Sequence, residues 1–192
     1  MWIRYVITGL VFVAVVAVIW TGCATSRAGY QSAPYRVLKQ AGLFELREYP
    51  SLVLVETPMR GADDSFMRLF RYIGGQNTAT QKIAMTTPVF MAGTDTNATM
   101  AFVMPKTMSV EATPRPTNPS VAVNSIPAGQ FAVWRFSGGR TTGNETNAVA
   151  TLSTWLQREK LTSMGAPLFG YFDPPWTPVF MRRNEVMLRI AP

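Results

Sequence analysis

Few side chains in this sequence could carry out chemistry, and their types restrict what that chemistry can be. Tyr171, Asp173 and Glu185 could act as acids or bases, but their spacing does not show that they converge. The chain contains no histidine, which removes the usual general base and a common metal ligand. The sequence also contains no phosphate-binding glycine motif. We therefore expect a binding protein and not an enzyme.

The single cysteine, Cys23, follows two small residues at the end of an apolar run from Tyr5 to Trp20. A secretory signal core has about 7 to 15 residues and a membrane-spanning helix about 20, so the length of this run does not separate them. The Thr-Gly-Cys end resembles the lipobox of bacterial lipoproteins, although Trp20 stands where that pattern usually has an aliphatic residue. This resemblance predicts a signal peptide over residues 1–22 and a lipidated tether over residues 23–34. An uncleaved membrane anchor is the alternative.

A lipoprotein signal implies export to the cell envelope. Because Ala24 and not Asp follows the cysteine, the resemblance favours the periplasmic face of the outer membrane over the inner membrane. The chain has a net charge of +7, and a basic surface can attract nucleic acid, anionic lipid or an acidic ligand. Export argues against nucleic acid. We expect a membrane attachment and a small ligand, but no nucleic-acid partner.

The spacing of apolar residues and the positions of Gly and Pro predict the helices and strands that carry the candidate residues. A helix over residues 64–73 places Phe66, Leu69, Phe70 and Ile73 at helical spacing along one face. A second helix is expected over residues 145–159. Strands rich in β-branched and aromatic residues are expected at 35–38, 44–48, 52–57, 83–91, 100–104, 121–124, 131–136, 168–172 and 185–190.

The order of these elements repeats along the chain. Pro50 and Pro127 are 77 residues apart, and Gly61 and Gly138 have the same offset. This spacing indicates two copies of a unit made of a β-hairpin, a helix and a second hairpin. One unit cannot bury both a sheet face and a helix stripe alone. We therefore predict an α+β fold in one domain over residues 35–192, with a curved antiparallel sheet and two helices.

Several segments in this order resemble the SOUL haem-binding protein family. They are Lys82-Ile83-Ala84-Met85-Thr86-Thr87-Pro88-Val89, Tyr72-Ile73-Gly74-Gly75, Phe102-Val103-Met104-Pro105, Phe136-Ser137-Gly138, Tyr171-Phe172-Asp173-Pro174-Pro175-Trp176-Thr177-Pro178 and Arg182-Arg183-Asn184-Glu185-Val186. The resemblance spans about residues 35–190. It implies a distorted antiparallel β-barrel of two pseudo-symmetric βαββ-type repeats with two helices.

The same resemblance implies tetrapyrrole binding on the apolar face of the first helix and adjoining strands, with Arg71 able to meet a propionate. The expected ligand-binding residues are Phe66, Leu69, Phe70, Arg71, Ile73, Met85, Tyr171, Trp176 and Glu185. Core packing alone would also require the helix stripe, and Met85 is either a core residue or a soft iron ligand. Glu185 either pairs with an arginine or meets a cationic ligand, as in the related effector-binding domains of multidrug regulators.

The expected cofactor is haem, held without histidine in a hydrophobic cleft. Apolar contact alone would hold it, or Met, Tyr or the N-terminal region would ligate the iron. Eleven Met and eleven Phe residues can supply adaptable apolar walls. Two other functions stay open at this point, namely binding of other hydrophobic or cationic small molecules and a structural role as an envelope lipoprotein.

Overall fold

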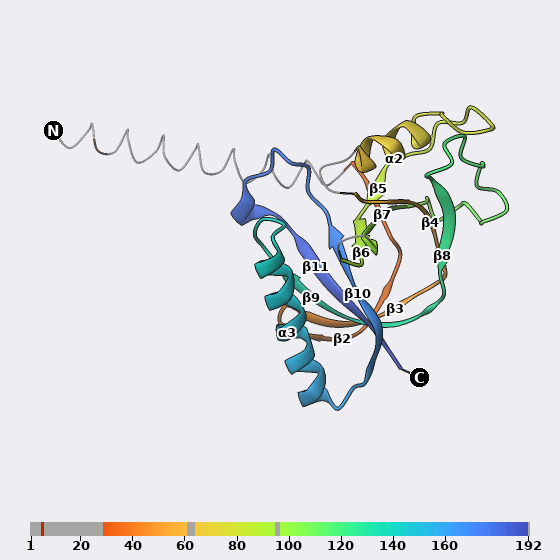
Figure 1. The fold of residues 1–192 in the computed structure, drawn as a ribbon. Coiled ribbons are helices and arrows are strands. Elements are labelled where there is room, and N and C mark those ends of the chain that lie inside the picture. Colours follow the sequence, from red (N-terminus) through yellow and green to blue (C-terminus); the bar gives the residue numbers. More distant parts are fainter. Residues whose placement is uncertain (1–4, 6–28, 61–63, 95–96, 192) are drawn as a thin grey trace.

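The computed structural model describes Tyr5 and residues 29–60, 64–94 and 97–191 (Figure 1). Apart from Tyr5, the predicted signal peptide lies outside the described residues, and so does the predicted lipidation site Cys23. Among the described residues, no helix has both the length and the apolar character needed to cross a membrane.

The fold is α+β, as predicted. The helices are α2 (Ser65–Ile73), α3 (Thr142–Glu159) and the short 3-10 helix η2 (Val179–Met181). The strands are β1 (Gln31–Ser32), β2 (Arg36–Ala41), β3 (Phe44–Tyr49), β4 (Leu52–Pro58), β5 (Thr86–Thr87), β6 (Val89–Ala92), β7 (Thr99–Val103), β8 (Ala122–Ile126), β9 (Gly129–Phe136), β10 (Ser163–Tyr171) and β11 (Asn184–Ile190).

Nine strands form one antiparallel sheet in the order β2-β3-β9-β11-β10-β6-β7-β4-β8. If β2 is set aside, exchanging β3 with β8, β4 with β9, β6 with β10 and β7 with β11 reverses this order. The sheet therefore has an approximate two-fold axis between β6 and β10, and the two repeat units are β4-α2-β6-β7 and β9-α3-β10-β11. The predicted repeat is therefore found in the order in which the strands pair.

The strands before each helix do not form the hairpins that we predicted. Strand β3 pairs with β2 and β9, whereas β4 pairs with β7 and β8. Residues near Pro50 and Pro127 form corners, because proline cannot donate a ladder hydrogen bond. Each corner passes the chain from one repeat to the other, so the two repeats share strands.

The prediction of a barrel was wrong. Strand β2 pairs only with β3, and β8 pairs only with β4, so the ends of the sheet do not meet. All six residues of β2 are exposed, so this edge of the sheet is open to solvent in the described part of the chain. The sheet is strongly curved and open (Figure 1).

Each helix covers the strands of its own repeat. Helix α2 packs on β4 and β7 through Leu69, Tyr72 and Ile73, and α3 packs on β9 and β11 through Leu152 and Leu156. A third cluster lies between the two helical layers. Apart from Ala33, its members come from β3, β4, β6, β7, β9 and β11 and include Tyr49, Leu54, Phe90, Phe131, Val133 and Met187.

Two segments differ from the sequence-based expectations. The strand predicted at 83–91 begins only at Thr86 and is interrupted at Pro88, which has no amide hydrogen to donate. Residues 31–33 of the expected tether contact the domain: β1 pairs with β5 in parallel, and the Ala33 amide donates to the Thr87 carbonyl at 2.8 Å. Among the described residues, strand pairing begins at Gln31.

Candidate functional site

Helix α2 carries an exposed apolar face made of Phe66, Met67 and Phe70. The side chains are 43%, 40% and 47% exposed. The two phenylalanine rings stack with their centroids 6.0 Å apart and 15° between their planes, and the Phe66 ring meets the buried Phe102 ring edge to face with centroids 5.3 Å apart. Large apolar groups gathered on a protein surface indicate an interaction site more often than scattered ones. We call these three residues the α2 face.

The predicted stripe therefore divides between two roles. Leu69 and Ile73 are buried in the core with Tyr72, whose hydroxyl donates to the Pro114 carbonyl at 2.7 Å. Leu69 is fully buried on the core, whereas Phe66 contacts Phe102 of β7 with its ring and stays 43% exposed, and Phe70 stays 47% exposed. Core packing explains Leu69 and Ile73, but it leaves nearly half of Phe66 and Phe70 in water.

The cation expected beside this surface is present. Arg71 donates to the Asp64 carboxylate at 2.8 Å, and both side chains are about half exposed. Asp64 precedes the helix but makes no side-chain cap, because its carboxylate pairs with Arg71. Met85 is half-buried and packs against the same core as Leu69, which supports the core role over that of an iron ligand.

Glu185 lies in a different place, inside a buried charge cluster. Its carboxylate accepts two hydrogen bonds from Arg47, at 2.7 and 3.0 Å, and two from Arg183, at 3.0 and 2.5 Å. Arg47 also donates to Glu45 at 2.6 Å and to the Tyr49 hydroxyl at 3.0 Å. The arginine-paired alternative for Glu185 is therefore the one found.

Burial and pairing have opposite effects on the pKa of Glu185 in this charge cluster. Burial alone would raise the pKa of Glu185, but the hydrogen bonds and charges of Arg47 and Arg183 outweigh it and hold the pKa below its usual value. Burial raises the pKa of Tyr49, and the charge of Arg47 offsets only part of that effect. Glu185 stays ionised and has its charge neutralised, so a cationic ligand would have to displace an arginine to reach it.

The two remaining predicted residues belong to neither group. The Tyr171 hydroxyl donates to the Glu145 carboxylate, which joins β10 to α3, and burial raises the pKa of this phenol with a further contribution from that hydrogen bond. Trp176 is 76% exposed in the loop between β10 and β11. The nine predicted residues are thus spread over α2, the core, the buried charge cluster, β10 and this loop.

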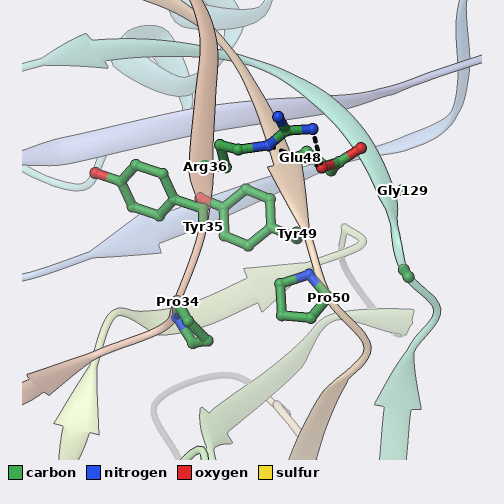
Figure 2. A pocket seen from close by; sticks show the side chains of 8 residues that line it. Pro34, Tyr35, Arg36, Glu48, Tyr49, Pro50 and Gly129 are labelled. Atoms are coloured by element: carbon green, nitrogen blue, oxygen red, sulfur yellow. Dashed lines mark hydrogen bonds and ion pairs between the residues drawn. The ribbon is translucent and has the colours of Figure 1, made fainter.

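A pocket of about 620 Å³ lies at a place that we did not predict. Figure 2 shows the rings of Tyr35 and Tyr49 beside one another, with Pro34 and Pro50 below them and the paired Arg36 and Glu48 above. Ala128 and Gly129 complete the lining. An aromatic wall beside an ion pair can hold a ring-shaped ligand with a polar edge.

This pocket touches the charge cluster through Tyr35. The guanidinium of Arg47 lies over the Tyr35 ring at 4.1 Å, and the Tyr35 and Tyr49 rings are 5.3 Å apart. The alternation of β3 contains a signal for it, since Glu45, Arg47 and Tyr49 occupy one face and Phe44 and Leu46 the other. Because Phe44 and Leu46 are apolar, the sequence pattern places their side of β3 in the core. In the structure both faces of β3 are covered.

Within the described residues, no three His, Cys, Asp or Glu side chains gather in a way that could hold a metal ion.

Comparisons with known proteins agree with this architecture. The C-terminal domain of EcmrR superposes with a TM-score of 0.57 at 14% identity, covering 82% of this chain and 98% of that one. A structure of a hydrolase from Listeria innocua gives 0.58 at 9% identity, covering 80% and 94%, and another hydrolase structure from that organism gives 0.59 at 10%, covering 77% and 91%. At such identities these likenesses show the fold alone. No curated protein sequence matches the chain.

The sequence identifies the family, which the superpositions alone do not. The family model described as SOUL heme-binding protein matches residues 30–189, which include both helices and all strands except the final residue of β11. This range begins just before β1, the first strand in the described part of the chain. The chain therefore belongs to the SOUL heme-binding protein family.

Proposed function

We propose that this protein binds haem or a related tetrapyrrole on the α2 face, without histidine ligation. The observation that carries the proposal is the exposed, stacked pair Phe66 and Phe70 on a helix whose other side is fully packed. Family membership supports a tetrapyrrole as the ligand class. Phe66 and Phe70 leave nearly half of their surface in water. A ligand that covered them would bury this apolar surface, which favours binding.

The residues of this face fit a flat apolar disc that carries two carboxylates. Phe66 and Phe70 offer nearly parallel rings, and Met67 is a flexible side chain that can adapt to a macrocycle. Arg71 would meet a propionate, because its surface pair with Asp64 contributes only about 0–1 kcal/mol and can be exchanged. Haem bound here would add its iron chemistry, while the chain supplies binding and orientation.

Binding of a cationic ligand at Glu185 receives less support. Arg47 and Arg183 already satisfy the carboxylate, and the side chain is 1% exposed. Removing one partner from a buried pair costs about 3–5 kcal/mol. A hydrophobic cation would have to offset that cost before it gained any affinity.

We also propose that the domain is held at the cell envelope by its N-terminal segment. The apolar run from Tyr5 to Trp20 and the Thr-Gly-Cys end support an export signal with lipid on Cys23. Two acyl chains on one cysteine would anchor the domain stably, since a single chain binds membranes only marginally. Ala24 favours the outer membrane, facing the periplasm.

Absorbance titrations with haemin and protoporphyrin test the tetrapyrrole proposal. We expect saturable one-to-one binding of both compounds, with a change in the Soret band. Phe70→Asp should weaken both by at least tenfold, about 1.4 kcal/mol, because it places a charge in the centre of the α2 face. Met164→Asp is the matched control, since Met164 is equally exposed on β10 and should leave affinity unchanged.

Tyr35→Ala separates the two candidate locations. If this substitution weakens binding and Phe70→Asp does not, the ligand lies in the pocket between Tyr35 and Tyr49, and the assignment to the α2 face is wrong. If neither haemin nor protoporphyrin binds saturably to the unaltered chain, the proposed function itself is wrong.

A further inference from the structure

The loop between β10 and β11, residues 172–183, projects large apolar side chains into solvent. Trp176 and Phe180 are 76% and 77% exposed, and Val179 is 49% exposed. Trp176 and Phe180 are the two most exposed aromatic side chains among the described residues. Soluble surfaces rarely gather such groups without a partner.

Hydrogen bonds hold this loop in one shape. The guanidinium of Arg182 donates to the carbonyls of Thr177 and Pro175, at 2.9 and 2.6 Å. The Gly138 amide donates to the Val179 carbonyl at 3.2 Å, which ties the loop to the end of β9. Thr177 is buried between its exposed neighbours. The apolar side chains are therefore displayed by a fixed backbone.

The N-terminal segment enters the domain at the same end of the sheet. Strand β1 pairs with β5, and the next residue, Pro88, lies against Gly170 of β10. Val89 then pairs with Tyr171, the last residue before the loop. In Figure 1 the loop and α2 both lie on the upper side of the molecule, opposite the C-terminus.

The length of chain between the apolar run and the domain is short. Eight residues separate Trp20 from Gly29, and they reach at most about 30 Å at about 3.3–3.6 Å per residue. Lipidation at Cys23 would shorten this reach further. A domain attached in this way stays close to the bilayer, and the end that carries β1 is the end nearest to it.

From this geometry we propose that the β10–β11 loop docks on the lipid bilayer, with Trp176, Val179 and Phe180 inserted at the interface. Trp is amphipathic and is favoured at the boundary between headgroups and acyl chains. The chain carries a net charge of +7, of which +6 remains without residues 1–22, whose only charged side chain is Arg4, and this charge adds attraction to anionic lipid. The inference rests on the proposed membrane anchor for its orientation, and it does not depend on tetrapyrrole binding.

Quenching of Trp176 by brominated lipid tests the docking. The full chain is reconstituted in vesicles of phosphatidylcholine and phosphatidylglycerol in equal parts, with or without bromine on the acyl chains. The difference in fluorescence between the unaltered chain and Trp176→Phe gives the signal of Trp176. We expect this signal to lose most of its intensity in brominated vesicles. The vesicle experiment contains no haemin, so its outcome does not depend on tetrapyrrole binding and the two proposals are tested separately.

A tryptophan at the opposite end of β10 is the control. Met164→Trp in the Trp176→Phe background places the ring near the C-terminus, and its signal should be the same in both kinds of vesicle. If the Trp176 signal is unaffected by bromine while the chain sediments with the vesicles, the docking proposal is wrong and the anchor stands. If the chain does not sediment with the vesicles, both the anchor and the docking proposal are wrong. If the tryptophan introduced by Met164→Trp is quenched as strongly as Trp176, the proposed orientation is wrong.

Discussion

Arg47 and Glu185 form a bidentate ion pair that crosses an intervening strand. Arg47 lies on β3 and Glu185 on β11, and β9 separates these strands in the sheet. Both side chains are 1% exposed, and the donor–acceptor distances are 2.7 and 3.0 Å. The pair therefore connects the strand shared between the repeats to the last strand of the fold.

Glu185→Gln should destabilise the protein by about 3–5 kcal/mol, because it leaves the buried charge of Arg47 without its main partner. Urea unfolding measured by circular dichroism would give this value. Glu48→Gln is the control: Glu48 pairs with Arg36 at the surface, and its loss should cost only about 0–1 kcal/mol. Equal effects of the two substitutions would contradict the role of burial.

The pH dependence of stability should depend on the same carboxylate. Its folded-state pKa is lowered, so its contribution is present above the unfolded value of about 4.3 and is lost as the pH falls through the folded-state value. The unfolding free energies of the unaltered chain and Glu185→Gln should converge as the pH is lowered below about 4.3. A constant difference between them from neutral to acid pH would refute this linkage.

Leu69 and Phe70 are neighbours on α2 with opposite roles. Leu69→Ala should cost about 2–5 kcal/mol of stability, because it opens a cavity in the core under the helix. Phe70→Ala should stay within about 0.5 kcal/mol, because the ring is half exposed. Thermal unfolding of the two variants would measure both effects. A large loss for Phe70→Ala would mean that this ring supports the fold and is not held for a ligand.

Cys23→Ser tests the proposed lipid anchor. Without a thiol no diacylglycerol can be attached, so the precursor should remain unprocessed and run at a higher mass on a gel. Metabolic labelling with a fatty acid should be lost in the same variant. Normal processing and membrane retention of Cys23→Ser would favour an uncleaved anchor.

Much of the architecture could be predicted because it depends on patterns of neighbouring residues in the sequence. The offset between Pro50 and Pro127 marked two corners that the pseudo-symmetric sheet contains. The spacing of Leu69 and Ile73 identified the buried side of α2. The open edges of the sheet were not predictable in this way, because barrel closure depends on whether β2 and β8 meet, and no local pattern encodes that distance.

The sequence by itself determined the family, the α+β class with its repeat, and a site without imidazole, because motifs, periodicity and composition are properties of the chain. Only the tertiary structure decided which candidates face water. It buried Glu185 against Arg47, 138 residues away, and it left Phe70 and Trp176 exposed. The physical reason is that exposure and charge pairing depend on which strands become neighbours, and the order of strands in the sheet differs from their order in the sequence.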